Sequence, residues 1–243
     1  LPSNASLDVF PNNKTGNYHV KLPQTIDLHG DWEVSLYSIS YSNTWYTLQN
    51  RENLVYYSKD AGHNFWSSAN VDYGYYATVP ELIKAINTAM HKEIGSDKKI
   101  TFTFNPRTEK IKVTLAPLHY VKLCGKLSAM LGYGGADIKI RKSGESPYVA
   151  DLFGITSIYV YCDIVQPQIV GNTSVPLLRT IPVREKSGEL ITKTFTNIQY
   201  VPLQKKSFED IEILLRSDTG DAVPFERGKV IATLYFRKQS YFS

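Results

Sequence analysis

The five histidines are the residues of this chain that could bind a metal ion or transfer a proton. They lie singly, at His19, His29, His63, His91 and His119, and no two of them have HxH, HExxH or HxxxH spacing. Those spacings are the ones that bring two imidazoles to one metal ion. We therefore interpret each histidine as a surface or turn residue, and the sequence predicts no local metal site.

A glycine-rich segment, Gly132-Tyr133-Gly134-Gly135, is the nearest approach to a phosphate-binding loop. Nucleotide-binding loops follow a strand and open a helix, and a P-loop also carries a lysine before Ser or Thr. Here the segment follows an expected helix, precedes an expected strand and lacks that lysine. We interpret it as a helix stop followed by a turn.

The thiols and carboxylates give no clearer sign of catalysis. Cys124 and Cys162 lie far apart without a CxxC motif, so we expect buried, reduced thiols and folding in the cytosol or the nucleus. Strand alternation places Glu209 on one face and both Asp210 and Glu212 on the other, which divides this acidic cluster. Since no GxSxG motif occurs, the sequence predicts a protein that is not an enzyme and needs no cofactor.

The composition is that of an ordinary globular chain, with 243 residues, 42% hydrophobic and 21% charged. A chain of this length can bury a core without disulfides or metals, as one large domain or two small ones. No apolar run approaches the roughly 18 residues of a membrane span, and the N-terminus lacks the basic and apolar regions of a signal peptide. Seventeen tyrosines beside two methionines favour β structure and contact surfaces.

The net charge of +4 has a local origin. Residues 122–142 carry five basic side chains and one acidic one, whereas residues 1–121 carry 11 of each. Such a stretch is compatible with a contact to phosphate groups or with solvated lysines that flank apolar positions. A dedicated nucleic-acid domain would be more basic. The five basic residues are Lys122, Lys126, Lys139, Arg141 and Lys142.

Alternation of apolar and polar residues dominates the chain and predicts about nine strands. In residues 32–41, for example, Trp32, Val34 and Leu36 share one face. Asn105 and Pro106 form a turn between two of the predicted strands. The predicted strands cover residues 19–22, 32–41, 74–79, 99–104, 110–115, 155–165, 193–201, 207–216 and 229–237.

Two segments have the spacing of helices instead. Thr78 and Glu81 form a capping box before an apolar stripe, which predicts a helix over residues 80–92. Apolar residues in 119–131 predict a second helix, which Gly132 ends. Both stripes are interpreted as core-packing faces, with a partner groove as the alternative.

Strands without regular alternation with helices indicate an all-β, antiparallel fold. We predict a single jelly-roll β-sandwich over residues 1–243, with eight or nine main strands, two short helices and long aromatic-rich loops. The long loops are residues 42–73 and 166–189. The first contains too many aromatic residues to remain in water, so it either folds back as further strands or docks on a partner.

A series of short segments, in order along nearly the whole chain, resembles Polinton/Maverick-type (adintovirus-like) minor capsid proteins. The resemblance is clearest in Gly30-Asp31-Trp32-Glu33. Each segment alone is weak, whereas their common order makes the set fairly specific. The segments lie at residues 1–6, 10–13, 18–23, 26–28, 30–36, 43–46, 80–87, 158–165, 177–183, 200–203, 211–216 and 219–225.

The resemblance implies a penton subunit, a protein that forms homopentamers at the five-fold vertices of an icosahedral viral or virus-like transposon capsid. Its neighbours there would be double jelly-roll major capsid proteins, which need about twice this β content. The resemblance also implies a place in the virion after folding in the host cytoplasm or nucleus. The basic stretch 122–142 then either makes a weak contact with packaged DNA or forms a solvated edge.

A ring of five subunits requires a head-to-tail interface, and long aromatic loops are suitable material for it. For each candidate the alternative is ordinary packing within the chain. A different function class also stays open, a glycan- or receptor-binding jelly-roll module that uses exposed aromatic residues. The expected interface residues are Trp45, Tyr46, Phe65, Trp66 and Tyr73 from the first long loop, and Arg179 from the second.

Overall fold

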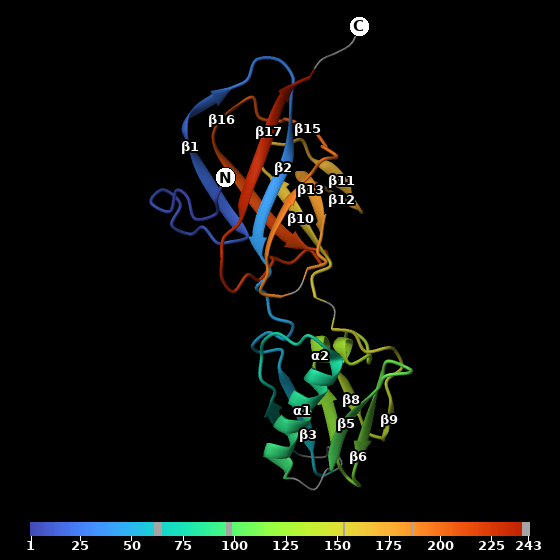
Figure 1. Cartoon of the computed structure of the whole chain (residues 1–243). Helices are drawn as coiled ribbons and strands as arrows, with labels where there is room; N and C mark the ends of the chain where they lie inside the picture. The colour runs from blue at the N-terminus through green and yellow to red at the C-terminus, as the bar shows by residue number, and fades with distance from the viewer. Residues whose placement is uncertain (61–64, 96–98, 153, 186, 240–243) are drawn as a thin grey trace. The chain divides into compact units, whose positions relative to one another are not determined.

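The chain forms two compact units (Figure 1). The sandwich unit consists of residues Leu1–Trp45 and Ile155–Ser243, and the inserted unit consists of residues Tyr46–Gly154. His63 lies outside the described residues. This computed structural model describes residues 1–60, 65–95, 99–152, 154–185 and 187–239.

The first sheet of the sandwich unit contains four antiparallel strands in the order β1-β16-β10-β13. The N-terminal strand therefore pairs with a strand from near the C-terminus, and in the described residues β1 and β13 are its edges (Figure 1). The strands are β1 (Asn17–Asp27), β10 (Ser157–Cys162), β13 (Leu177–Pro182) and β16 (Ser207–Ser217).

The second sheet is built around β2 (Trp32–Ser42). One edge of β2 pairs with β17 (Ile231–Lys238), and the other edge pairs with β14 (Leu190–Thr194) and β15 (Val201–Pro202). A separate two-stranded ribbon consists of β11 (Gln168–Val170) and β12 (Thr173–Val175).

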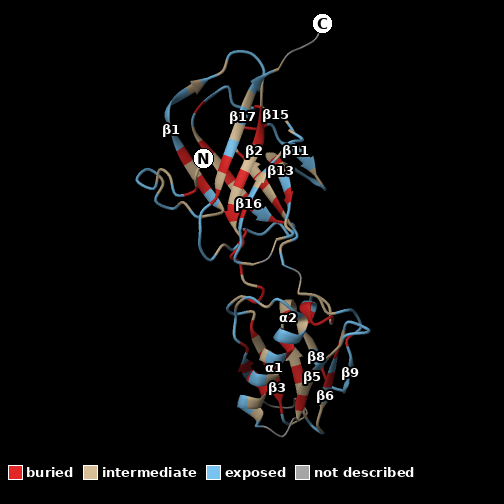
Figure 2. Cartoon of the chain, in the orientation of Figure 1, coloured by how far each residue is buried: buried red, intermediate tan, exposed pale blue. Residues whose placement is uncertain are grey.

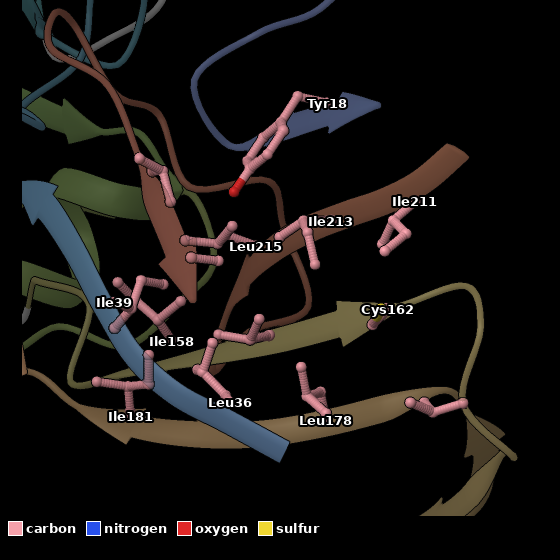
Figure 3. Packing of buried hydrophobic residues seen from close by; sticks show 14 of the residues in the cluster. Tyr18, Leu36, Ile39, Ile158, Cys162, Leu178, Ile181, Ile211, Ile213 and Leu215 are labelled. Carbon is pink, nitrogen blue, oxygen red and sulfur yellow. The ribbon is translucent and has the colours of Figure 1, made fainter. Parts of the chain in front are cut away.

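The core of the sandwich unit lies between these two sheets (Figures 2 and 3). Leu36 and Ile39 of β2 are fully buried, as are Ile158 of β10 and both Ile213 and Leu215 of β16. Ile213 and Leu215 lie two positions apart on β16, whereas Leu36 and Ile39 lie on either side of an irregularity in the register of β2, so each sheet turns one apolar face inward. The predicted fold class, an all-β jelly-roll sandwich, is confirmed.

The inserted unit enters the chain between β2 and β10 and has a hydrophobic core of its own. Its larger sheet has the strand order β4-β3-β7-β8, and its smaller sheet has the order β5-β6-β9. Helices α1 (Val79–Ile94) and α2 (Gly125–Met130) complete it. The strands are β3 (Leu54–Ser58), β4 (Ser67–Asn70), β5 (Ile100–Asn105), β6 (Lys110–Leu115), β7 (Tyr120–Leu123), β8 (Ile138–Ile140) and β9 (Gly144–Glu145).

Helix α1 confirms the capping-box prediction. The Thr78 hydroxyl accepts a hydrogen bond from the Glu81 N–H at 3.4 Å, and the Glu81 carboxylate accepts one from the Ala77 N–H at 2.9 Å. Its predicted apolar stripe, which includes Leu82 and Ile86, is buried. Neither helix of the described residues combines the length and apolarity needed to cross a bilayer.

The two-unit organisation differs from the single domain that the sequence predicts. Residues 42–73, expected as one long loop, contribute the end of β2 and then β3 and β4. The inserted unit closes separately because its apolar residues, among them Val55, Ala69 and Phe102, pack on one another. The aromatic segment has therefore folded back as further strands, one of the two alternatives considered for it.

Four further segments differ from their predicted structure. The predicted strand 193–201 is interrupted, because β14 ends at Thr194 and β15 begins at Val201. Residues 74–79 contain no strand in the structure, and α1 begins there at Val79. Residues 120–123 form β7 instead of a helix, because Val121 and Leu123 alternate into the core. The predicted loop 166–189 contains β11, β12 and β13.

The turn predicted at the glycine-rich segment is confirmed. Gly132 has a φ of +77° and Gly134 a φ of +97°, backbone angles that residues other than glycine rarely adopt. At Gly132 the backbone also approaches another segment, since the Tyr148 N–H donates a hydrogen bond to its carbonyl at 3.0 Å. A Cβ atom at this position would overlap the Tyr148 carbonyl oxygen.

Candidate functional site

Trp45, the first expected interface residue, lies in the core of the sandwich unit. Only 7% of it is exposed, and its ring packs against Tyr41 and Phe225 with centroids 6.4 Å and 5.7 Å away. A partner protein or a sugar has no access to a ring in this position. Ordinary packing within the chain, the alternative considered for it, is what the structure shows.

Tyr46 and Tyr73 lie together in the inserted unit. Their rings have centroids 6.2 Å apart and are tilted by 53°. The backbone supports this pair, because the Leu48 N–H donates to the Gly74 carbonyl and the Gly74 N–H donates back, at 3.0 Å and 2.9 Å. Tyr46 is half-buried and Tyr73 is 52% exposed, so Tyr73 offers an accessible ring.

Phe65 and Trp66 have different surroundings although they are neighbours in sequence. Phe65 is 79% exposed, which makes it one of the most accessible apolar residues of the described chain. Trp66 is half-buried, and the Lys139 ammonium lies 5.7 Å from the centroid of its ring. The sequence singled out both aromatic residues but not the pairing of Trp66 with Lys139.

Arg179 is half-buried and contacts the segment that follows β14 in the sandwich unit. Its position on β13 is opposite Val160 of β10, next to an irregularity in the register. The guanidinium carbon lies 3.8 Å from the centroid of Phe195, and an Nη2 hydrogen is donated to the Asn197 carbonyl at 3.0 Å. Burial lowers the pKa of Arg179. These contacts give the side chain a role inside the fold.

Two exposed apolar residues of the sandwich unit were missed by the sequence analysis. Ile169, on the β11–β12 ribbon, is 85% exposed, and Leu190, at the start of β14, is 73% exposed. A hairpin signal was available, because β-branched residues flank Gly171 and Asn172. A hairpin signal does not, however, show whether a single apolar residue within a polar segment is exposed or buried.

The outer face of the β2 sheet carries a further group of contacts that the sequence did not single out. Arg237 donates from Nε to the Glu33 carboxylate at 2.8 Å, and its guanidinium carbon lies 3.6 Å from the centroid of the Tyr200 ring. Tyr37 and Tyr235 stack on the same sheet. Tyr235 is 45% exposed, so this face presents aromatic surface to solvent.

The net charge of the chain belongs to the inserted unit. Residues 46–154 carry 14 Lys and Arg against 10 Asp and Glu, whereas the sandwich unit carries 13 of each. Part of the basic stretch is neutralised, because Lys122 pairs with Asp137 at 3.0 Å and Lys126 with Glu52 at 2.7 Å. These pairs weaken the case for a contact with DNA along residues 122–142.

The cysteines, histidines and acidic residues of the described chain show no arrangement for metal binding. Burial raises the pKa of the Cys162 thiol to about 12, and the half-buried Cys124 also has a raised pKa. His19 lies 3.7 Å from Asp210 and 3.5 Å from Glu212. Within the described residues, no three His, Cys, Asp or Glu side chains gather in a way that could hold a metal ion.

Comparison with known proteins gives a likeness of fold. No protein-family model matches the sequence, and no curated protein matches it. Among solved structures, the chain is similar to the crystal structure of selenomethionine-labelled mavirus penton protein, with a TM-score of 0.50 and 10% sequence identity. The similarity covers 92% of this chain and 92% of that protein, so it extends over parts of both units.

Proposed function

We propose that the chain is a minor capsid protein of the Polinton/Maverick type, the penton subunit of an icosahedral viral or virus-like transposon capsid. The observation that carries this proposal is the similarity in fold to the mavirus penton protein over 92% of both chains. Jelly rolls serve several functions, so the fold alone does not choose among them. The ordered capsid-like segments of the sequence, such as residues 158–165 and 177–183, favour the capsid.

In the proposed homopentamer each subunit contacts its two neighbours through different patches, because a closed ring of five needs a head-to-tail interface. The exposed Ile169 on the β11–β12 ribbon suits one side of that contact. Leu190 and Tyr235 on the outer face of the β2 sheet suit the other. Phe65 and Tyr73 remain accessible in the inserted unit and are retained as further candidates.

The proposed partner of the ring is a double jelly-roll major capsid protein, and the proposed location is the virion vertex. A structural role of this kind asks for contact surfaces and not for a catalytic site or a cofactor. The protein would fold in the host cytoplasm or nucleus, where thiols stay reduced. Cys162 fits that setting because it lies buried in the core of the sandwich unit.

The assembly is tested by light scattering on the purified full chain and by negative-stain electron microscopy. Five subunits of 27.5 kDa give an expected mass of about 138 kDa, and the particles should be five-fold rings. Ile169→Glu should shift the mass towards the monomer, because a charge cannot be buried unpaired in the interface. Leu118→Glu, which places the same charge at an exposed apolar residue of the inserted unit, is the matched control and should leave the rings intact.

A chain that stays monomeric at every concentration, alone and with the major capsid protein, would contradict the penton proposal. Rings that persist in the Ile169→Glu variant would keep the proposal but remove the β11–β12 ribbon from the interface. The two results are distinguishable because the first concerns the wild-type chain and the second only the variant.

A further inference from the structure

The outer face of the β4-β3-β7-β8 sheet combines aromatic and basic side chains. The register pairs Tyr56 with Ser68 on one side and with Lys122 on the other, and Lys122 in turn with Lys139. Residues that pair directly across antiparallel strands point to the same face of a sheet. These four side chains therefore form one row across all four strands, opposite to the face that Val55 and its neighbours bury.

Trp66 belongs to the same face. It directly precedes Ser67 of β4, so alternation along the chain places it on the side of Ser68. The position of its ring agrees, because the Lys139 ammonium lies 5.7 Å from the ring centroid. The Lys122 ammonium lies 5.6 Å from the centroid of Tyr56. This face thus contains two aromatic rings, each with an ammonium group within cation–π distance.

The two lysines of this face differ in their charge balance. Lys122 pairs with Asp137 at 3.0 Å, and this pair raises the pKa of the lysine and lowers that of the carboxylate. Lys139 is exposed, and none of the described carboxylates forms an ion pair with it. The face therefore presents one uncompensated cation beside two aromatic rings, on the unit that holds the whole net charge of the chain.

We propose that this face binds an acidic oligosaccharide, with a sulfate or carboxylate on Lys139 and sugar rings stacked on Trp66 and Tyr56. The apolar faces of sugar rings pack on aromatic side chains, and a lysine ammonium pairs with a single anionic group as a point charge. The proposed site does not depend on assembly into rings.

A single-stranded nucleic acid is the competing ligand, because aromatic residues on a four-stranded sheet can also stack bases. Each nucleotide brings one phosphate, however, and binding such a chain requires a track of several cations. This face offers two lysines, of which Asp137 neutralises one. An oligosaccharide that carries few anionic groups therefore fits a face whose described residues include one unpaired lysine better than a nucleic acid does.

The test measures the affinity of the full-length protein for four probes by isothermal titration calorimetry. The acidic probes are a heparin oligosaccharide and sialyllactose, the neutral probe is lactose, and the nucleic acid is an oligothymidylate. We expect at least one acidic probe to bind, with an affinity that falls as salt is added. Lactose should bind more weakly than sialyllactose, because it lacks the carboxylate.

Variants locate the site. Lys139→Ala and Trp66→Ala should each weaken binding of the acidic probe by about fivefold or more, the loss expected for one charge-assisted contact or one stacked ring. Lys112→Ala removes the same charge from an exposed position on the smaller sheet and should change the affinity by less than about twofold. Because Lys139 is exposed, its variant keeps the test valid if Trp66→Ala unfolds.

The proposal is overturned if neither acidic probe binds. It is also overturned if Lys139→Ala and Lys112→Ala weaken binding equally, because equal effects would indicate a general electrostatic attraction to the basic inserted unit. Tighter binding of oligothymidylate with the same dependence on Trp66 and Lys139 would assign the face to nucleic acid instead. None of these results bears on ring formation, which light scattering measures separately.

Discussion

The rings of Tyr37 and Tyr235 stack almost parallel on the outer face of the β2 sheet, with centroids 4.2 Å apart and an angle of 7° between their planes. Ser35, which pairs with Tyr235 in the register, is fully buried. Tyr235→Ala removes one ring of this stacked pair, which joins β17 to β2. The substitution should therefore lower the free energy of unfolding by about 1 kcal/mol. Urea unfolding followed by circular dichroism measures this change.

Tyr148→Ala is the matched control for that loss. Tyr148 is 66% exposed, and replacing it should change the free energy of unfolding by less than about 0.5 kcal/mol. Equal effects of the two substitutions would show that the stacked pair adds nothing beyond an ordinary surface tyrosine.

Substitutions at Gly132 and Gly134 can distinguish the cost of a left-handed backbone conformation from the cost of a steric overlap. Both have a positive φ, but a Cβ at Gly132 would overlap the carbonyl oxygen of Tyr148, whereas no atom lies within 4 Å of one at Gly134. Gly134→Ala should cost about 1 kcal/mol, the strain of a left-handed residue. Gly132→Ala should cost at least about 2 kcal/mol more, because the backbone must also shift. Thermal unfolding of the two variants tests the difference, and similar losses would contradict it.

The Lys122–Asp137 pair predicts an acid-dependent contribution to stability. The hydrogen bond from Lys122, and then the one from the Gly125 N–H at 3.0 Å, lowers the pKa of Asp137. A carboxylate with a lowered folded pKa stabilises the fold above its unfolded pKa, about 3.9, and loses this contribution as the pH falls through the folded value. The effect should be small and should decrease with added salt, because the pair is exposed.

Asp137→Asn should therefore be less stable than the wild type near neutral pH and should approach it as the pH falls below about 4. Urea unfolding over that pH range gives the comparison. A difference in stability that persists undiminished in acid would mean that Asp137 acts through something other than its charge.

Cys162 should be unreactive in the folded protein. Its side chain is 1% exposed, and burial raises its pKa to about 12, so the reactive thiolate is scarce at neutral pH. In a Cys124→Ser variant, which leaves Cys162 as the remaining thiol, an aromatic disulfide reagent should label the protein only after unfolding. Stoichiometric labelling of the folded variant would contradict the buried position of this side chain.

The sequence predicted those elements in which local pattern and burial agree. In residues 110–115, Ile111 and Val113 alternate with polar residues and are buried, so the predicted strand and β6 have the same bounds. The capping residues Thr78 and Glu81 likewise located the start of α1 within two residues. Such signals are contained in neighbouring residues and do not depend on the rest of the chain.

The division into two units had no comparable local signal. Trp45 and Tyr46 are adjacent aromatic residues, yet the first belongs to the core of the sandwich unit and the second to the inserted unit. No run of glycine or proline marks the boundary between them. Which aromatic residues stay accessible follows from long-range pairing, and this is why Phe65 remained an interface candidate while Trp45 did not.

The position of the inserted unit in the chain has a consequence for the order of folding during synthesis. Strands β1 and β2 are synthesised before the inserted unit, but their partners β16 and β17 are synthesised after it. The inserted unit is complete long before that, and contacts distant in sequence form slowly. We expect nascent chains to carry a folded inserted unit beside the unpaired strands β1 and β2, and therefore to need protection from aggregation until β16 and β17 have been synthesised.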